Sequence, residues 1–244
     1  MITLIDLGSI FWRVYHATKS GHRAYDGTID DLAWYRQHHQ NVIVCADSYS
    51  ARRKQLSPAY KANRPDKQPE AIDALERVET WAAETGRLEK VKGHEADDVI
   101  ATLTEQAAFM DSVRIVTPDK DLYQLVNDTL DVKLITRQGE VDEAGVVARY
   151  KVKASQIADW LALSGDAADG IVGCPRVGAG KAAALLQRFG SLDGILAATD
   201  EEILSVRGIG DTVLSGLREW DPTLARELVR LELDVDVQLF REAA

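Results

Sequence analysis

The sequence predicts an α/β fold with a mostly parallel central sheet, followed by a smaller helical module. Four short runs rich in β-branched residues alternate with helical patterns, and they cover residues 2–6, 42–47, 113–117 and 132–136. Such alternation is typical of parallel sheets with flanking helices. From about residue 152 the pattern changes to helices separated by glycines. Two domains are therefore expected, residues 1–151 and residues 152–244.

Composition limits the class of protein. With 244 residues, 45% of them hydrophobic, the chain can bury a substantial core. No apolar run approaches the ~20 residues that span a bilayer, and the N-terminus lacks the basic start of a signal peptide, so a cytoplasmic protein without a membrane partner is expected. The two cysteines give neither a disulfide framework nor paired metal ligands. A net charge of −10 argues against nonspecific coating of nucleic acid, without excluding a nucleic-acid substrate.

Three of the four predicted strands lead into carboxylates. The first run ends on Asp6, the second on Asp47, and the third is followed by Asp119 and Asp121. The carboxyl ends of parallel strands lie along one edge of a sheet, so these side chains are expected to converge there. A single aspartate after a strand is more often a helix cap. Three strand ends in succession favour a binding site.

Three acidic residues directly precede the apolar run 99–103: Glu95, Asp97 and Asp98. They are predicted to lie in the first turn of a helix. One acid gains from the amides at a helix start, but three repel one another unless water or a cation separates them. A divalent metal explains the cluster, and a solvated acidic turn is the alternative. Because the histidines show no zinc pattern, an oxygen-only site for Mg²⁺, Mn²⁺ or Ca²⁺ is expected.

Asp166 and Asp169 add two carboxylates, which share a face if their segment is helical. Oxygen-rich sites that hold two Mg²⁺ ions roughly 3.5 to 4 Å apart hydrolyse phosphodiesters. Phosphoryl hydrolysis is therefore the predicted reaction. The candidate metal ligands are nine carboxylates: Asp6, Asp47, Glu95, Asp97, Asp98, Asp119, Asp121, Asp166 and Asp169.

A phosphodiester also needs positive charge, and residues 52–67 hold six basic residues against one acid in an otherwise acidic chain. Lys61 and Arg64 are three apart, so a helix would set them on one face toward a single phosphate. Tyr60 beside them has a ring that can stack on a base. A solvated basic loop is the alternative interpretation.

Residues 176–181 form a glycine-rich segment that opens a predicted helix at Lys181. The segment is not a Walker loop, because Pro175 and Ala182 occupy the positions of a required glycine and serine or threonine, and no strand leads into it as in a Rossmann fold. A hairpin here presents free amides to phosphate, and its carbonyls can surround a monovalent cation. Residues 205–210 look similar, which indicates a weak helix-hairpin-helix repeat. A purely structural hairpin is the alternative.

In this order along the chain, these motifs resemble the 5′ nuclease family, which includes the 5′ nuclease domain of bacterial DNA polymerase I, stand-alone bacteriophage 5′ exonucleases and flap endonucleases. The resemblance runs nearly end to end. It is carried by residues 4–6 with Arg13, 46–47, 60–64, 93–98, 119–121 and 165–169, and by the hairpin at 173–181.

The resemblance implies a PIN-like catalytic domain with a helical arch at about residues 61–86, and a C-terminal helix-three-turn-helix module that grips duplex DNA. It implies a structure-specific 5′ nuclease that acts on DNA with 5′ flaps, free 5′ ends or single-strand/duplex junctions. Two divalent ions, Mg²⁺ or Mn²⁺, would be held by the nine carboxylates. The residues implied to contact the reacting phosphate are Arg13, Lys61 and Arg64. Those implied to bind DNA are Tyr60, Arg176, Gly178, Gly180 and Lys181. Those implied to hold a potassium ion are Gly173, Val177, Gly178 and Gly180.

Two departures from the family pattern lie near the first strand. Leu7 follows Asp6 where a small residue is usual, and the segment from Asp6 to Asp47 is short. The rival functions are a noncatalytic branched-DNA-binding protein and a PIN-type ribonuclease, which the filled carboxylate positions and the glycine hairpin respectively disfavour. A monomeric enzyme in the cytoplasm of a bacterium or a phage-infected cell is expected. The sequence indicates no function for residues 231–244.

Overall fold

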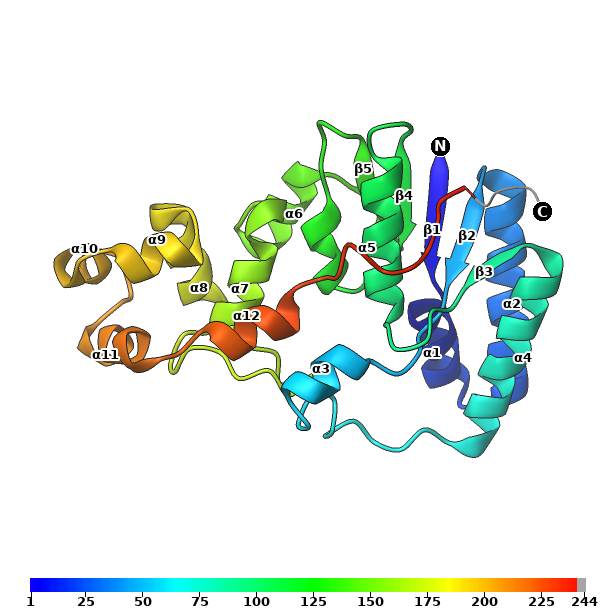
Figure 1. The fold of residues 1–244 in the computed structure, drawn as a ribbon, viewed down its shortest axis with the longest axis horizontal. Coiled ribbons are helices and arrows are strands. Elements are labelled where there is room, and N and C mark those ends of the chain that lie inside the picture. Colours follow the sequence, from blue (N-terminus) through cyan, green and yellow to red (C-terminus); the bar gives the residue numbers. More distant parts are fainter. Residues whose placement is uncertain (241–244) are drawn as a thin grey trace. The chain divides into compact units, whose positions relative to one another are not determined.

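The computed structural model describes residues 1–240, and contacts within the chain divide it into two compact units. Unit 1 contains residues 1–51, residues 65–142 and the described residues from 231 onward; unit 2 contains residues 52–64 and 143–230. Figure 1 draws the chain in sequence colours. The boundary after residue 151 stays a prediction, and residues 241–244 of the predicted second domain lie outside the described residues.

Unit 1 is built on a six-stranded sheet with the order β3-β2-β1-β4-β5-β6. The first five strands pair in parallel, and the last pairs antiparallel to its neighbour. The mostly parallel sheet predicted from the sequence is confirmed, with two short edge strands that were not predicted. The strands are β1 (Ile2–Asp6), β2 (Val42–Cys45), β3 (Arg87–Glu89), β4 (Val113–Val116), β5 (Val132–Thr136) and β6 (Gly139–Val141).

Helices cover both faces of this sheet. Their bounds are α1 (Leu7–Thr18), α2 (Gly21–His38), α4 (Pro69–Thr85) and α5 (Ala96–Ala107), with a 3₁₀ turn η1 (Asp121–Leu125). Ile5, Val44 and Val116 of the central strands join one buried cluster with α1, α2 and α4. Strand side chains alternate, so Leu4 faces the opposite side, where α5 packs against β1, β2 and β4. Burial on both faces explains why the central strands read as continuous apolar runs.

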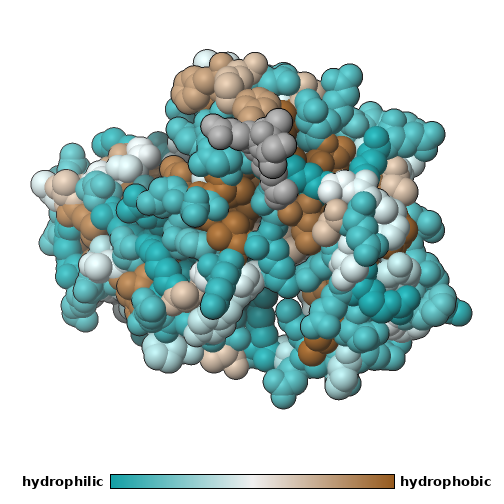
Figure 2. Space-filling view, turned by 45° about the vertical axis from the view of Figure 1, so that its right-hand side comes forward, coloured by the Kyte–Doolittle hydropathy of each residue, from teal (hydrophilic) through white to brown (hydrophobic). Residues whose placement is uncertain are grey.

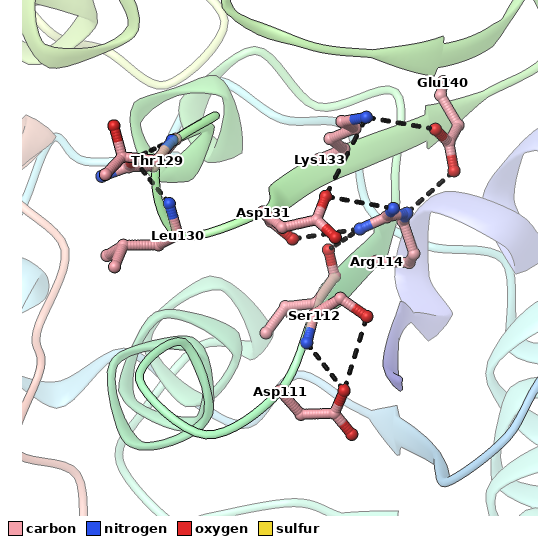
Figure 3. A network of polar contacts seen from close by, with 10 residues as sticks. Asp111, Ser112, Arg114, Thr129, Leu130, Asp131, Lys133 and Glu140 are labelled. Carbon is pink, nitrogen blue, oxygen red and sulfur yellow. Dashed lines mark hydrogen bonds and ion pairs between the residues drawn. The ribbon is translucent and has the colours of Figure 1, made fainter.

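Charged side chains join the last three strands (Figure 3). Arg114 of β4 contacts the Asp131 carboxylate at 3.2 Å and the Glu140 carboxylate at 2.8 Å. Lys133 of β5 lies 3.9 Å from Asp131 and 3.7 Å from Glu140. The Arg114 side chain is only 11% exposed, which reduces the screening that makes fully exposed ion pairs weak. This network therefore fixes β6 beside β5 although β6 has only three residues.

Residues 231–240, the C-terminal strap, lie along α5, and Figure 1 shows this red segment crossing that helix. The strap has alternating buried residues, Leu231, Val235, Val237 and Leu239. Gln106 donates to the Val237 carbonyl at 2.9 Å and accepts from the Leu239 amide at 2.7 Å. A single α5 side chain thus satisfies two strap backbone groups that have no sheet partner.

Replacing Gln106 by alanine should lower the free energy of unfolding by about 1–3 kcal/mol, because two largely buried backbone groups lose their partner. Urea unfolding of Gln106→Ala measures this. Gln138→Ala is the matched control, since Gln138 is exposed in the turn between β5 and β6 and its loss should change stability little. Equal midpoints for both variants would show that the strap contributes nothing through Gln106.

Unit 2 is helical. Its elements are α6 (Glu143–Tyr150), the 3₁₀ turn η2 (Ala154–Gln156), α7 (Ile157–Ser164), α8 (Ala179–Phe189), α9 (Leu192–Ala197), α10 (Asp200–Leu204), α11 (Asp211–Glu219) and α12 (Thr223–Val229). The unit also takes in residues 52–64, which begin in α3 (Ala51–Leu56). Arg53 is 3% exposed and donates to the Leu228 and Arg230 carbonyls at 3.0 and 2.9 Å. The basic segment is therefore anchored to the end of α12.

Hydrophilic residues cover most of the face shown in Figure 2, and brown hydrophobic residues form smaller separate areas. Within residues 1–240, every helix is too short or too polar to span a bilayer.

Candidate metal centre and nucleic-acid contacts

The carboxyl edge of the sheet carries Asp6 at its centre. Asp6 ends β1 between β2 and β4, and it also caps α1 by accepting from the Ser9 amide at 3.1 Å. Thr117, the residue after β4, donates its hydroxyl to the second Asp6 oxygen at 2.8 Å. The Asp6 side chain is thus fixed at the sheet edge although it is only 5% exposed.

Burial raises the pKa of Asp6 to about 6, above the usual 3.8 of aspartate, and repulsion from Asp47 adds to the rise. Hydrogen bonds from Ser9 and Thr117 oppose the shift but do not cancel it. The edge therefore holds two neighbouring carboxylates in an arrangement that disfavours their joint ionisation. A bound cation would reverse this effect, because it favours the ionised form of both.

Gly8 was not among the predicted site residues, yet it lies against both of these carboxylates. A Cβ at this position would stand 3.2 Å from an Asp47 oxygen and 3.5 Å from an Asp6 oxygen. Leu7, which departs from the family pattern, is fully buried in the core. Gly8 is therefore the small residue that the site requires. A glycine inside a predicted helix, where it costs stability, was the available signal.

A Gly8→Ala variant should lose roughly five- to tenfold of the nuclease activity expected from the sequence, because the new methyl group displaces Asp47 by a few tenths of an ångström. Its stability should be unchanged or higher, since alanine suits a helix better than glycine. Steady-state cleavage rates and thermal melting of the same preparation measure both effects. Loss of stability together with activity would show that the methyl group disturbs the fold rather than the carboxylates.

The start of α5 brings a second group of acids to this edge. Asp47 accepts from the Ala96 amide at 3.0 Å, so it caps α5 while lying beside Asp6. Glu95 is the N-cap residue and is buried, and Asp97 lies in the first turn, as predicted. Asp97 is also among the like charges that raise the pKa of the buried Cys45 thiol, behind burial, Asp6 and Glu89. Asp97 therefore lies near the end of β2.

Asp119 and Asp121 follow β4 in a tight turn. The Asp119 amide donates to the Thr117 hydroxyl, and the Asp121 amide donates to the Asp119 carboxylate, both at 3.0 Å. Since the same Thr117 hydroxyl bonds Asp6, this turn is tied to the central strand. Asp119 and Asp121 are partly buried. Their positions agree with the expected arrangement at the carboxyl edge, while metal binding by either stays a prediction.

Asp98 differs from the other acids of α5. It is fully buried and accepts from the Glu232 amide of the C-terminal strap at 3.0 Å. His94, Asp98 and Glu232 each offer one ligand atom, all within 4.8 Å of one another, and the His94 ring nitrogen lies 3.4 Å from the Glu232 carboxylate. At least one Asp98 oxygen thus anchors the strap, which the sequence pattern did not reveal. Its assignment as a ligand of the predicted metal centre stays a prediction.

The remaining predicted ligands, Asp166 and Asp169, belong to unit 2 and lie in a turn rather than on the helix considered for them. Asp166 and Ile171 exchange backbone hydrogen bonds at 2.9 and 2.8 Å, which closes the turn as a small hairpin. The two side chains are 7% and 5% exposed. Gly170 completes this turn with φ +71°, and a Cβ there would lie 2.6 Å from the Ala59 carbonyl.

The Asp169 carboxylate contacts both of the basic side chains predicted to bind phosphate. Arg64 forms an ion pair with one Asp169 oxygen, and the Lys61 ammonium lies 3.8 Å from the other. The Lys61 amide also donates to the Asp169 carbonyl at 2.9 Å, and Asn63 donates to the Ala167 carbonyl at 2.6 Å. Lys61 and Arg64 lie in turns rather than on a helix, and the Arg64 amide donates to the Lys61 carbonyl at 3.4 Å. They nevertheless converge on one carboxylate.

Tyr60 and Arg13 both have partners within the protein. Tyr60 is 3% exposed and has the Lys61 ammonium 4.9 Å from its ring centroid. The stacking on a DNA base predicted for Tyr60 does not fit this burial. Arg13 lies on α1 and forms an ion pair with Asp31 of α2. A phosphate would have to compete with Asp31, and the phosphate contact of Arg13 stays a prediction.

The two glycine hairpins of unit 2 share one geometry. In the first, the Val177 amide donates to the Cys174 carbonyl at 3.1 Å, and Gly178 caps α8. In the second, the Ile209 amide donates to the Val206 carbonyl at 3.0 Å, and Gly210 caps α11. The internal repeat seen in the sequence is thus present in the structure.

The glycines of the first hairpin have two different roles. Gly178 and Gly180 face open space, which allows a ligand to approach the start of α8. Gly173 is packed, because a Cβ there would lie 2.3 Å from the Gly165 amide. Lys181 donates to the Arg176 carbonyl at 3.0 Å, within the hairpin. DNA binding by Arg176 and Lys181, and potassium binding by the residues named for it, stay predictions.

Two family models match the chain in succession. The model described as the 5′-3′ exonuclease N-terminal resolvase-like domain matches residues 1–151, and the model described as the 5′-3′ exonuclease C-terminal SAM fold matches residues 152–243. A 5′-3′ exonuclease of Streptomyces coelicolor is 36% identical, over 81% of this chain and 75% of that protein. The flap endonuclease Xni of Aeromonas salmonicida is 33% identical, over 75% of this chain and 68% of that protein. Similar DNA polymerases I are longer, and the chain spans 19% of the Rhizobium leguminosarum enzyme.

Among solved structures, the flap endonuclease of bacteriophage T5, in a complex with DNA and metal ions, superposes with a TM-score of 0.78. The match covers 95% of this chain and 89% of that one at 19% identity, which establishes the fold. Both family models and both relatives agree with the motifs described above. The chain therefore belongs to the 5′-3′ exonuclease and flap endonuclease family.

Proposed function

We propose that the protein is a divalent-metal-dependent 5′ nuclease, which hydrolyses DNA phosphodiesters at 5′ flaps, free 5′ ends and single-strand/duplex junctions. The observation that carries this proposal is the group of acids at the carboxyl edge of the sheet in unit 1. Asp6 and Asp47 lie together there, and the acids of α5 and of the turn after β4 are close in the fold. Membership of a nuclease family gives the reaction class.

The donor set fits a hard divalent cation. It consists of carboxylate oxygens at the ends of adjacent strands and at a helix start, which are the ligands Mg²⁺ and Mn²⁺ accept. The raised pKa of Asp6 supports the same conclusion, because the buried Asp6 carboxylate and the exposed Asp47 carboxylate beside it are stabilised when a cation offsets their repulsion. Two such ions, when bound by these acids, would supply the positive charge that lowers the pKa of an attacking water and stabilises the leaving oxygen. Asp6, Asp47, Asp97, Asp119 and Asp121 are the acids proposed to hold them from unit 1.

The residues that contact the phosphate are proposed from unit 2. Asp169 orients Lys61 and Arg64 toward one point, so a phosphate oxygen that replaces this carboxylate would meet two positive charges. The open backbone around Gly178 and Gly180 supports binding of a DNA phosphate at the first hairpin, independent of base sequence. The T5 relative, which is described in a complex with DNA and metal ions, supports both parts of this proposal.

The test is product mapping on a 5′-flap substrate labelled at its 5′ end, incubated with the protein in Mg²⁺ or in EDTA. A released flap in Mg²⁺, with intact substrate in EDTA, is the expected result. Mononucleotides from the labelled end would indicate exonucleolytic cleavage by the same centre. Tight binding of the flap without cleavage in Mg²⁺ or Mn²⁺ would support the noncatalytic DNA-binding alternative instead. Cleavage of an RNA flap alone would support a ribonuclease.

A further inference from the structure

A pocket of about 390 Å³ lies in unit 1, directly beside the carboxyl edge of the sheet. It falls at the small end of the roughly 300–1,000 Å³ range of ligand pockets. Gly8 and Asp47 form its boundary with the metal centre, and α4 contributes Ile72, Leu75 and Glu76. Of the site residues predicted from the sequence, Asp47 alone belongs to this lining. The pocket is therefore a separate feature of the fold that shares one wall with the site.

The lining combines buried apolar residues with exposed side chains, one of which is aromatic. Leu7 and Ala46 are at most 1% exposed and form the inner wall. Tyr49 is 65% exposed and Ile72 is 41% exposed, so both present apolar surface to water. An aromatic ring and aliphatic side chains in the lining of one small pocket suit a flat apolar ligand, because they can pack against its faces.

The charges of the pocket indicate which part of a nucleotide enters it. Asp47, Glu76 and Glu79 contribute three carboxylates, against the two ammonium groups of Lys67 and Lys90. Lys90 is already bound to both oxygens of Glu79, at 2.9 and 2.7 Å. A phosphate inside the pocket would meet a net negative charge. A nucleobase suits it better, because the ring is uncharged and its amino groups can donate to these carboxylates.

Lys67, which belongs to the lining, offers a positive charge to a phosphate of the same nucleotide. Its ammonium group lies 4.9 Å from the centre of the Trp12 ring, which holds the side chain in place. Asp47 stands in the wall shared with the carboxyl edge of the sheet. A nucleotide whose base fills the pocket would thus have its own phosphates near both Lys67 and the metal centre. The base belongs to a nucleotide adjacent to the scissile phosphate.

Base pairing decides on which side of that phosphate the nucleotide lies. A base in a duplex is held by its partner, and extruding it costs a few kcal/mol. The flap lies on the 5′ side of that phosphate and is single-stranded, so a base of the flap can enter at little cost. We propose that the pocket lined by Tyr49, Ile72 and Glu76 binds the nucleobase on the 5′ side of the scissile phosphate. This inference rests on the proposed function and assigns a new base subsite to it.

The experiment compares two 5′-flap substrates, one intact and one with an abasic residue at the first nucleotide 5′ of the cleavage site. The parent should cleave the abasic substrate with a kcat/KM roughly tenfold lower, the size expected for one lost stacking contact. Tyr49→Ala should lose a similar factor on the intact substrate and little more on the abasic one. Tyr49→Phe should behave as the parent does. Thermal melting checks the fold, which should persist because Tyr49 is exposed.

Phe109→Ala is the matched control, because Phe109 is an exposed aromatic residue of unit 1 outside the pocket. It should cleave both substrates as the parent does. Equal losses for Tyr49→Ala on the intact and abasic substrates would overturn the base subsite, as would a parent that cleaves the two at the same rate. In both cases the parent still cleaves the flap, so the proposed function stands. A parent that cleaves neither substrate in Mg²⁺ would overturn the proposed function and the subsite with it.

Discussion

An Asp119→Asn variant should keep its fold and lose roughly 10²-fold or more of its cleavage rate on a 5′-flap substrate in Mg²⁺. Asparagine retains the oxygen that accepts from the Asp121 amide at 3.0 Å, so the turn after β4 can stay closed. What it loses is the negative charge that the proposed metal centre requires. Single-turnover cleavage of an end-labelled flap, with circular dichroism to check the fold, measures the effect.

The matched control for this substitution is Asp131→Asn. Asp131 precedes β5, at the amino edge of the sheet, and takes part in the network with Arg114 and Lys133 (Figure 3). Its φ of +50° is one that asparagine adopts readily. This variant undergoes the same chemical change away from the proposed centre and should cleave at the parent's rate. Equal activity of Asp119→Asn, Asp131→Asn and the parent would contradict the metal centre at the carboxyl edge.

The second large effect concerns stability. Without metal, Asp6→Asn should raise the free energy of unfolding at pH 7.5 by up to about 3 kcal/mol. The folded protein holds Asp6 at a pKa of about 6, whereas the unfolded chain has the usual 3.8. The protonated form is therefore the one that folding favours. Stability is unaffected below pH 3.8 and falls as the pH rises through 6, when this buried carboxyl must ionise beside Asp47.

Asparagine is uncharged at every pH, so it removes this loss while its amide remains a partner for Ser9 and Thr117. Urea unfolding in EDTA at pH 4.5 and pH 7.5 tests the sign. The advantage of the variant over the parent should be large at pH 7.5 and small at pH 4.5. A variant that is less stable than the parent at pH 7.5 would show that ionised Asp6 is stabilised within the protein itself. Such a result would remove the electrostatic argument for a cation.

The sequence allowed the centre of the fold to be predicted because its signals are local. The strands at residues 2–6 and 132–136 have the predicted bounds, and α5 begins at the predicted acidic turn. Two predicted strands end one or two residues early, at Cys45 and Val116. The edge strands β3 and β6 have three residues each, which is too short for a periodic pattern to reveal.

Other features depend on partners far away in the sequence. The alternating residues of the C-terminal strap were visible, but their partners Thr102 and Gln106 lie 130 and 131 positions earlier. Lys61 and Arg64 were expected to meet through helical spacing, and they meet through Asp169 instead. Tyr60 was expected to contact DNA because it adjoins these cations. Its burial depends on the packing of residues 52–64 in unit 2, which no local pattern specifies.

In the candidate site, too, some features could be predicted from local sequence signals and others depend on residues far away in the sequence. Strand ends could be assigned to one edge from the alternation of strands and helices alone, which is sufficient to bring Asp6, Asp47 and Asp119 together. The sequence could not tell an acid that faces this edge from one that anchors a neighbouring segment, as Asp98 does with the Glu232 amide. Nor could it reveal that Gly8 leaves room for the Asp47 carboxylate, because that distance is set by two elements 39 positions apart.

The central claim is that the carboxyl edge of unit 1 binds a divalent cation. Titration of the metal-free protein with Mn²⁺, followed by electron paramagnetic resonance of the unbound ion, tests it without DNA and without a cleavage assay. The account predicts saturable binding to the parent and to Asp131→Asn, and much weaker binding to Asp6→Asn and Asp119→Asn. Equal binding by all four proteins, or no saturable binding by the parent, would contradict it.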